Sequence, residues 1–81
     1  MVVLENVKKE ENRIQLNFHF VGVETVGSAV YDIQKGEVIE ASYGDKNPLE
    51  DIVYGFKYVV DACKMMVEHN RYPATLEYAW Y

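Results

Sequence analysis

The run Ile14-Gln15-Leu16-Asn17-Phe18-His19-Phe20 decides the fold of this chain. Its four apolar side chains, Ile14, Leu16, Phe18 and Phe20, alternate with polar ones, and this period of two is typical of a strand with one buried face. A shift of one residue in the strand register would expose all four apolar side chains to water, so the register is well determined. The sequence therefore predicts a β-strand whose phenylalanines lie in the core.

Three further segments around this run are also expected to be strands. Residues 2–7 are rich in β-branched side chains, and residues 26–33 and 38–43 alternate in polarity. In the last segment the pattern places Ile39, Ala41 and Tyr43 on one face. The connections between the segments are short, which predicts an antiparallel β-meander of three or four strands. Two sets of residues compete for the inward side of the first strand: Val2, Leu4 and Asn6, or Val3, Glu5 and Val7.

The spacing of apolar residues changes to that of a helix after the sheet. Asn47, Pro48 and Glu50 are residue types favoured at the N-cap, first and third positions of a helix, and Glu50 also adds negative charge at the positive end of the dipole. Asn70 is a residue type that ends helices in the left-handed conformation. We therefore predict a long C-terminal α-helix over residues 47–70, packed on the sheet.

The last segment, residues 73–81, is a short aromatic tail that fits two patterns. Leu76, Tyr78 and Trp80 alternate as in a strand, whereas Leu76, Ala79 and Trp80 have the spacing of a short helix. Of the two, we favour a helical turn. In either form so short a segment needs to pack against the main helix or the edge of the sheet.

The length and composition of the chain limit the number of domains and the kinds of partner that we expect. With 81 residues the chain is interpreted as a single α+β domain, with the sheet over residues 1–44. A formal net charge of −5 disfavours nucleic acid, and the longest uncharged run, Ile14–Val23, is far shorter than the roughly 20 apolar residues of a membrane span. A lone cysteine, Cys63, allows no internal disulfide and fits a reducing compartment. We therefore expect a cytoplasmic protein without nucleic-acid or membrane partners.

Residues capable of catalysis or metal binding are few and scattered. Cys63 lies in the middle of the apolar arc of the predicted helix, where burial raises a thiol pKa and makes the sulfur inert. His19, His69 and Cys63 do not have the spacing of a metal site. The five glycines form no nucleotide-binding motif. We expect no enzyme activity, no metal and no cofactor.

Surplus aromatic residues are the candidates for a contact surface. On the helix, Tyr54, Tyr58 and Met65 lie away from the apolar arc, and the C-terminal region adds Tyr72, Tyr78 and Trp80. Tyrosine and tryptophan give large contact areas at low entropic cost and recur in interface hot spots. Two interpretations stay open: these six residues form a binding or dimer surface, or the tail folds back and covers the three residues on the helix.

From Tyr31 onward the chain resembles a family of short, uncharacterised bacterial proteins, a domain of unknown function associated with spore-forming Firmicutes. The resemblance covers about 50 residues and is carried by Tyr31-Asp32-Ile33, a second strand ending at Tyr43, the amphipathic helix and the run Asn70-Arg71-Tyr72-Pro73-Ala74-Thr75-Leu76-Glu77. It implies a sheet-plus-helix fold in a bacterial cytoplasm and no known activity.

Together these features predict a small, non-catalytic protein-interaction or regulatory module that self-associates, most simply as a homodimer, or binds another protein. The alternative is a small-ligand-binding or enzyme-like protein that uses a pocket between sheet and helix, with Tyr31, Tyr43 and Cys63 near its mouth.

Overall fold

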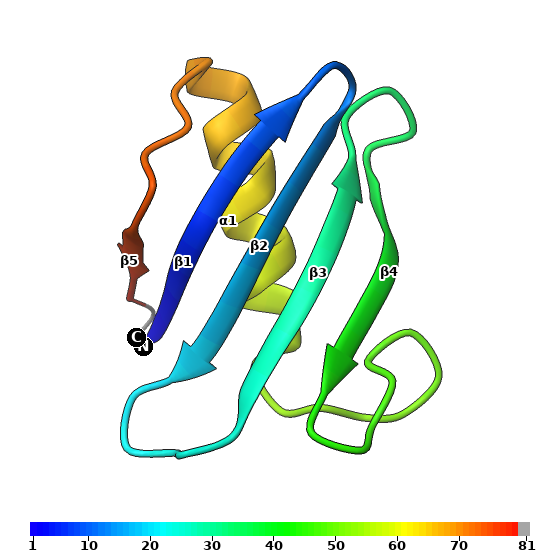
Figure 1. Ribbon diagram of the computed structural model, residues 1–81, viewed down its shortest axis with the longest axis vertical. Coiled ribbons are helices and arrows are strands. Elements are labelled where there is room, and N and C mark those ends of the chain that lie inside the picture. The colour runs from blue at the N-terminus through cyan, green and yellow to red at the C-terminus, as the bar shows by residue number, and fades with distance from the viewer. Residues whose placement is uncertain (80–81) are drawn as a thin grey trace.

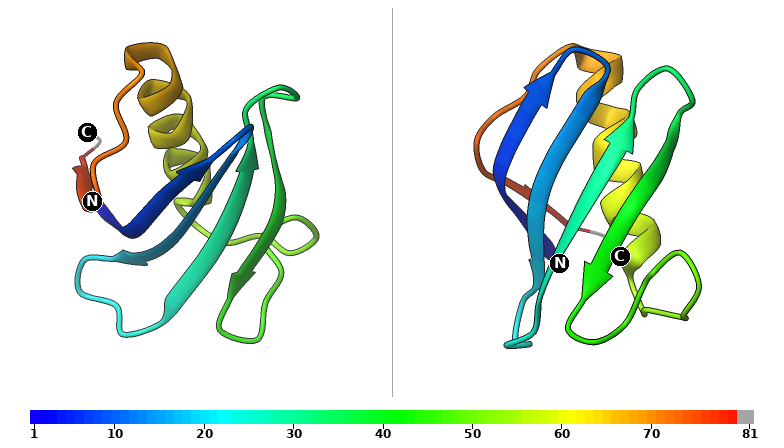
Figure 2. Two further views of the ribbon diagram at one scale, coloured as in Figure 1. Left: turned by 45° about the horizontal axis from the view of Figure 1, so that its top comes forward. Right: turned by 45° about the vertical axis from the view of Figure 1, so that its right-hand side comes forward.

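The computed structural model describes residues 1–79 as an antiparallel sheet with one helix against one face (Figures 1 and 2). The α+β class and the antiparallel meander predicted from the sequence are confirmed, but the sheet has five strands in place of the predicted three or four. The strand order is β4-β3-β2-β1-β5. The elements, in chain order, are β1 (Val2–Glu10), β2 (Arg13–Phe20), β3 (Val26–Asp32), β4 (Glu37–Tyr43), α1 (Phe56–His69) and β5 (Leu76–Tyr78).

The core lies between the sheet and α1. All four apolar side chains of β2 are buried, so the prediction that Phe18 and Phe20 point inward is confirmed. Ala29 and Tyr31 of β3 lie on the same face, and α1 contributes its own buried row. That row consists of Val59, Ala62, Cys63 and Met66.

A β-bulge in β1 settles which residues of that strand face inward. Val2 and Leu4 are fully buried, and the register shifts between Glu5 and Lys8. Asn6 takes a left-handed conformation there, with φ of 53°, and the bulge brings Val7 against the core. Each of the two competing patterns is therefore correct for only one part of the strand, because an extra residue reverses the alternation.

A second bulge, between Val30 and Tyr31, changes the face of β4. Tyr31 is opposite Val38, and Ala29 is opposite Ala41. Val38, Ala41 and Tyr43 consequently pack against the core, whereas Ile39 does not belong to it. The prediction that Ile39 shares a face with Ala41 and Tyr43 was wrong, because a bulge breaks the period of two.

The helix is shorter than predicted and is not a long C-terminal element. It spans 14 residues, about 21 Å, in place of the predicted range 47–70. Asn47 does organise one turn, since its carbonyl accepts hydrogen bonds from the amides of Glu50 and Asp51. The turn does not continue into α1. It ends by Asp51, residues 52–53 are not helical, and Gly55 directly before the helix has a left-handed conformation, with φ of 88°. Glu50 therefore does not complete a capping box, and α1 has no acidic residue in its first turn.

The predicted end of the helix is confirmed. Asn70 adopts the left-handed cap conformation, with φ of 50° and ψ of 44°, and its amide donates to carbonyls of the last turn. His69 lies in that turn, where a positive charge would interact favourably with the helix dipole.

The described part of the tail is a strand, so the expected helical turn was wrong. β5 pairs with β1 in an antiparallel manner, with Tyr78 opposite Val2 and Leu76 opposite Leu4. Upstream, the amide of Val7 donates to the carbonyl of Ala74 at 3.1 Å. The open edge of β1 supplies backbone hydrogen-bonding groups that a helical turn would leave without partners.

Candidate functional site

One end of the molecule gathers the exposed apolar side chains. This end is formed by the β2–β3 loop, the β4–α1 loop and the start of β1, all at the bottom of Figure 1. All seven large hydrophobic side chains that are exposed among residues 1–79 belong to these segments or to the adjoining first residue of β3. They are Met1, Val21, Val23, Val26, Leu49, Ile52 and Tyr54.

A groove of about 750 Å³ opens at this end. Two of its wall residues, Ile52 and Tyr54, are the most exposed of these apolar side chains, at 89% and 96%. Singly exposed apolar residues are common on proteins, whereas a group of them around a hollow is a candidate for an interaction site. The full lining is Met1, Phe20, Val21, Val23, Tyr43, Lys46, Ile52, Val53, Tyr54, Gly55, Lys57 and Tyr58.

The floor of the groove is part of an aromatic cluster. The rings of Phe20 and Tyr43 lie edge to face, with centroids 5.6 Å apart. Beneath them, the Phe18 ring stacks on Tyr43 at 5.8 Å and lies 5.6 Å from Phe56. The stacked and edge-to-face pairs are geometries that aromatic rings favour, and they pack the floor of the groove onto the core.

Backbone hydrogen bonds hold the walls in place. The amide of Val21 donates to the carbonyl of Met1 at 3.1 Å, which ties the β2–β3 loop to β1. On the other wall, Tyr43 and Lys46 exchange two backbone hydrogen bonds of 2.9 and 3.0 Å, and the amide of Phe56 donates to the carbonyl of Val53. The groove is therefore formed before any partner arrives, which lowers the entropic cost of binding.

The charge of the groove is opposite to that of the whole chain. Lys46 and Lys57 line it, and the lining contains no aspartate or glutamate, although the chain carries a net charge of −5. The ammonium of Lys57 lies 5.0 Å from the centroid of the Tyr58 ring, a cation–π contact. Within residues 1–79, neither lysine forms an ion pair. A partner with apolar groups and a carboxylate would match this lining.

The residues predicted as one contact surface lie in several places. Tyr54 and Tyr58 line the groove together. Met65 lies with Leu76 in a smaller hollow of about 420 Å³, at the far end of α1. Of the five predicted residues that the structure describes, Tyr54 and Tyr58 line the groove.

The remaining aromatic residues of that set have structural roles where they are described. The Tyr72 ring lies under the ammonium of Lys9, with 5.8 Å between the nitrogen and the centroid. Tyr78 packs against the core from β5. Trp80 is outside the described residues. Tyr54 is exposed, so the interpretation in which Tyr54, Tyr58 and Met65 are all covered fails at that residue.

A pocket with Tyr31 and Cys63 at its mouth does not exist in this form. Both side chains belong to the buried core, and only Tyr43 of the three predicted residues lines the groove. Burial raises the pKa of the Cys63 thiol to about 12, so the sulfur is protonated at neutral pH. The pKa of Tyr31 is also raised, first by burial and then by the neighbouring Cys63.

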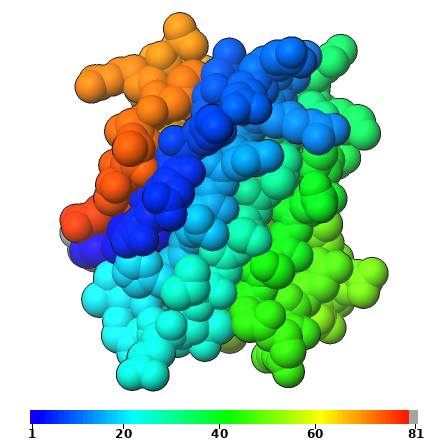
Figure 3. All heavy atoms as spheres, viewed as in Figure 1, coloured from blue at the N-terminus to red at the C-terminus, as the bar shows by residue number. Residues whose placement is uncertain are grey.

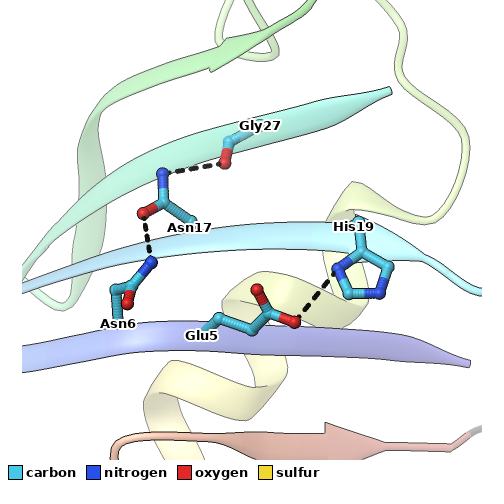
Figure 4. A network of polar contacts seen from close by, with 5 residues as sticks. All are labelled: Glu5, Asn6, Asn17, His19 and Gly27. Atoms are coloured by element: carbon cyan, nitrogen blue, oxygen red, sulfur yellow. Dashed lines mark hydrogen bonds and ion pairs between the residues drawn. The ribbon is translucent and has the colours of Figure 1, made fainter. Parts of the chain in front are cut away.

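The outer face of the sheet, seen in Figure 3, carries a polar network that stiffens it. In Figure 4 the side chain of Asn6 donates to Asn17 at 3.0 Å, and Asn17 donates to the carbonyl of Gly27. Nearby, Nδ1 of His19 lies 3.6 Å from the carboxylate of Glu5. These contacts connect β1, β2 and β3 around the bulge at Asn6, which gives the network a structural role.

Sequence reasoning missed the wall formed by the β2–β3 loop. Val21 and Val23 flank a turn glycine, where polar residues are usual, and both are exposed. This departure from the polar composition of turns was the available signal. Met1 was missed without any signal, because only the pairing of β1 brings it beside the loop.

No protein-family model, no curated protein and no solved structure matches this chain. The resemblance drawn from the sequence therefore stays a prediction. Within residues 1–79, no helix has the length and apolar character needed to cross a bilayer. The same residues contain no group of three or more histidine, cysteine, aspartate or glutamate side chains that could hold a metal ion.

Proposed function

We propose that this chain is a small, non-catalytic protein-interaction module and that the apolar groove is its contact surface. The observation that carries the proposal is the gathering of all seven exposed large hydrophobic side chains at the groove end of residues 1–79. A core-facing role does not explain Ile52 and Tyr54, because both point into solvent. Their burial by a partner would remove apolar surface from water, the main driving force of association.

The alternative from the sequence, a small-ligand-binding protein, also has an observation in its favour. The volume of about 750 Å³ is within the usual range for small-molecule sites. Such sites enclose most of their ligand, however, whereas Ile52 and Tyr54 extend outward from the rim. A partner large enough to cover the rim as well as the floor fits these side chains better.

The test measures binding of the fluorescent apolar dye bis-ANS to the protein at micromolar concentration. It also uses peptides that are selected for binding to the native chain from a random library displayed on phage. We expect the peptides to displace the dye, and Ile52→Ser and Tyr54→Ser to weaken peptide binding by about tenfold or more, which is about 1.4 kcal/mol. Val26→Ser is the matched control, because Val26 is exposed at the same end but does not line the groove.

Two results would contradict the proposal. One is that dye and peptides bind the variants and the native chain equally. The other is that small molecules displace the dye but no selected peptide does, which would favour the small-ligand alternative.

A further inference from the structure

The segment Leu49–Ile52, whose last residue also lines the groove, carries acidic charge that the lining lacks. Glu50 and Asp51 are exposed acidic residues, and they stand between two exposed apolar residues, Leu49 and Ile52. The groove has an apolar lining and two lysines without acidic neighbours in that lining. The segment Leu49–Ile52 and the groove are therefore complementary in both polarity and charge.

The segment is held in a fixed shape. The side-chain oxygen of Asn47 accepts a hydrogen bond from the amide of Leu49 at 2.9 Å. The carboxylate of Asp51 accepts one from the amide of Asn47, also at 2.9 Å. The carbonyl of Asn47 accepts two more, from Glu50 and Asp51. A segment ordered in advance loses little conformational entropy when it docks.

The segment does not satisfy the groove of its own molecule. Ile52 forms part of the groove wall yet remains 89% exposed, so its side chain points away from the floor. Glu50 forms no ion pair with Lys46 or Lys57 in the described part of the chain. The matching charges lie on one end of one molecule without meeting.

We propose that the occupant of the groove is a second copy of this chain. In a twofold dimer, the Leu49–Ile52 segment of each copy lies in the groove of the other, with Ile52 over the aromatic floor and Glu50 near Lys57. A twofold interface makes each such contact twice. This inference rests on the proposed function and names the partner.

Charge favours this exchange over a direct meeting of the two grooves. If groove faced groove, Lys46 and Lys57 of one copy would approach the same lysines of the other, and like charges would repel. In the reciprocal arrangement, each lysine pair meets the acidic segment of the partner. The complementarity therefore selects one mode of association.

The test is a charge exchange, measured by sedimentation equilibrium up to millimolar concentration. Glu50→Lys and Lys57→Glu should each weaken the dimer about three- to thirtyfold, because each alters two symmetric contacts. The double variant restores opposite charges and should return the dissociation constant to within about threefold of the native value. Glu40→Lys on β4 is the control and should leave association unchanged.

These substitutions should not weaken association by destabilising the folded chain. Glu50 is exposed. A glutamate at position 57, in the first turn of α1, would interact favourably with the helix dipole, which offsets the loss of the cation–π contact between Lys57 and Tyr58. Urea unfolding of each variant should give a free energy within about 0.5 kcal/mol of the native value, apart from any contribution of the dimer itself.

The outcomes separate this inference from the function on which it rests. If the chain stays monomeric at millimolar concentration, the inference that a second copy is the partner is wrong. The proposed function still stands in that case if the selected peptides bind the groove. Two results would overturn the reciprocal arrangement while Ile52→Ser still abolishes association. One is that neither charge variant weakens the dimer, and the other is that the double variant does not restore it. If dye and peptides also fail to respond to Ile52→Ser and Tyr54→Ser, the proposed function itself is wrong.

Discussion

Gly55 lies directly against the ring of Phe20, so close that a Cβ atom on Gly55 would stand 2.9 Å from Cε1 of that ring. The same glycine has φ of 88°, a conformation that other residues rarely adopt. This contact joins the start of α1 to the floor of the groove. The turn at Asn47 has already ended by Asp51, and Gly55 directly precedes the first residue of α1.

Substitution of this glycine should therefore cost more than backbone strain alone. We expect Gly55→Ala to lower the free energy of unfolding by about 2–4 kcal/mol, since it combines left-handed strain with a clash against Phe20. The matched control is Gly22→Ala, where φ is 86° but no atom lies within 4 Å. It should cost about 1–2 kcal/mol, the strain alone. Urea unfolding measures both, and equal losses would show that the contact with Phe20 is unimportant.

The left-handed cap at Asn70 gives a second prediction. Asn70→Ala should destabilise the protein by about 1 kcal/mol, because alanine does not tolerate φ of 50° as well as asparagine does. Asn70→Gly should be neutral or slightly stabilising, since glycine takes this conformation without steric cost. Thermal unfolding of the three proteins checks the order. A glycine variant less stable than the alanine variant would contradict the assigned role of the cap.

Exposed and packed tyrosines should respond differently to removal. Tyr54→Ser should change the free energy of unfolding by less than about 0.5 kcal/mol, because its side chain is exposed. Tyr78→Ser should cost about 1 kcal/mol or more, because Tyr78 packs against the core beside Val2. Both are compared at micromolar concentration by urea unfolding. A large loss for Tyr54→Ser would mean that Tyr54 serves the fold rather than a contact surface.

The buried thiol makes stability depend on alkaline pH. Its pKa rises from an ordinary value of 9 to about 12 in the folded chain, so between these values the unfolded state binds fewer protons. The stabilisation from burying the neutral thiol is fully present below pH 9 and is lost as the pH approaches 12. The slope reaches at most about 1.4 kcal/mol per pH unit.

The control for this effect is Cys63→Ala, which removes the thiol and its smaller contribution to the raised pKa of Tyr31 but keeps the larger contribution from burial. Alanine leaves a small cavity, so the native chain should be the more stable at pH 8. Urea unfolding from pH 8 to pH 11 should show the difference between the two proteins narrowing above pH 9. Parallel curves would contradict the raised pKa of the thiol.

Much of the sheet was predictable because strand faces follow a local rule. The alternation in β2 was enough to place Phe18 and Phe20 inward. It failed in β4, where Ile39 occupies a bulge, and it was ambiguous in β1, where a bulge at Asn6 reverses the pattern. Bulges are set by pairing with the neighbouring strand, so a single strand's sequence does not reveal them.

The candidate site was predictable only in part. Tyr54 and Tyr58 were recognised as surplus aromatics and do line the groove, whereas Met65 and Tyr78 lie elsewhere. The opposite wall, with Val21 and Val23, comes from a loop more than 20 residues away in sequence. No local pattern joins two loops, because their approach depends on how the helix packs on the sheet.

The sequence by itself determined which side of the central strand is buried and where the helix ends. Both are properties of a few neighbouring residues: alternating polarity in β2, and the tolerance of Asn70 for a left-handed conformation. Tertiary structure alone decided where the helix begins, that the tail becomes β5, and that a groove exists. Each of these depends on contacts between distant segments, such as Gly55 with Phe20 and Tyr78 with Val2. The local propensities of the residues do not include the free energy of such contacts.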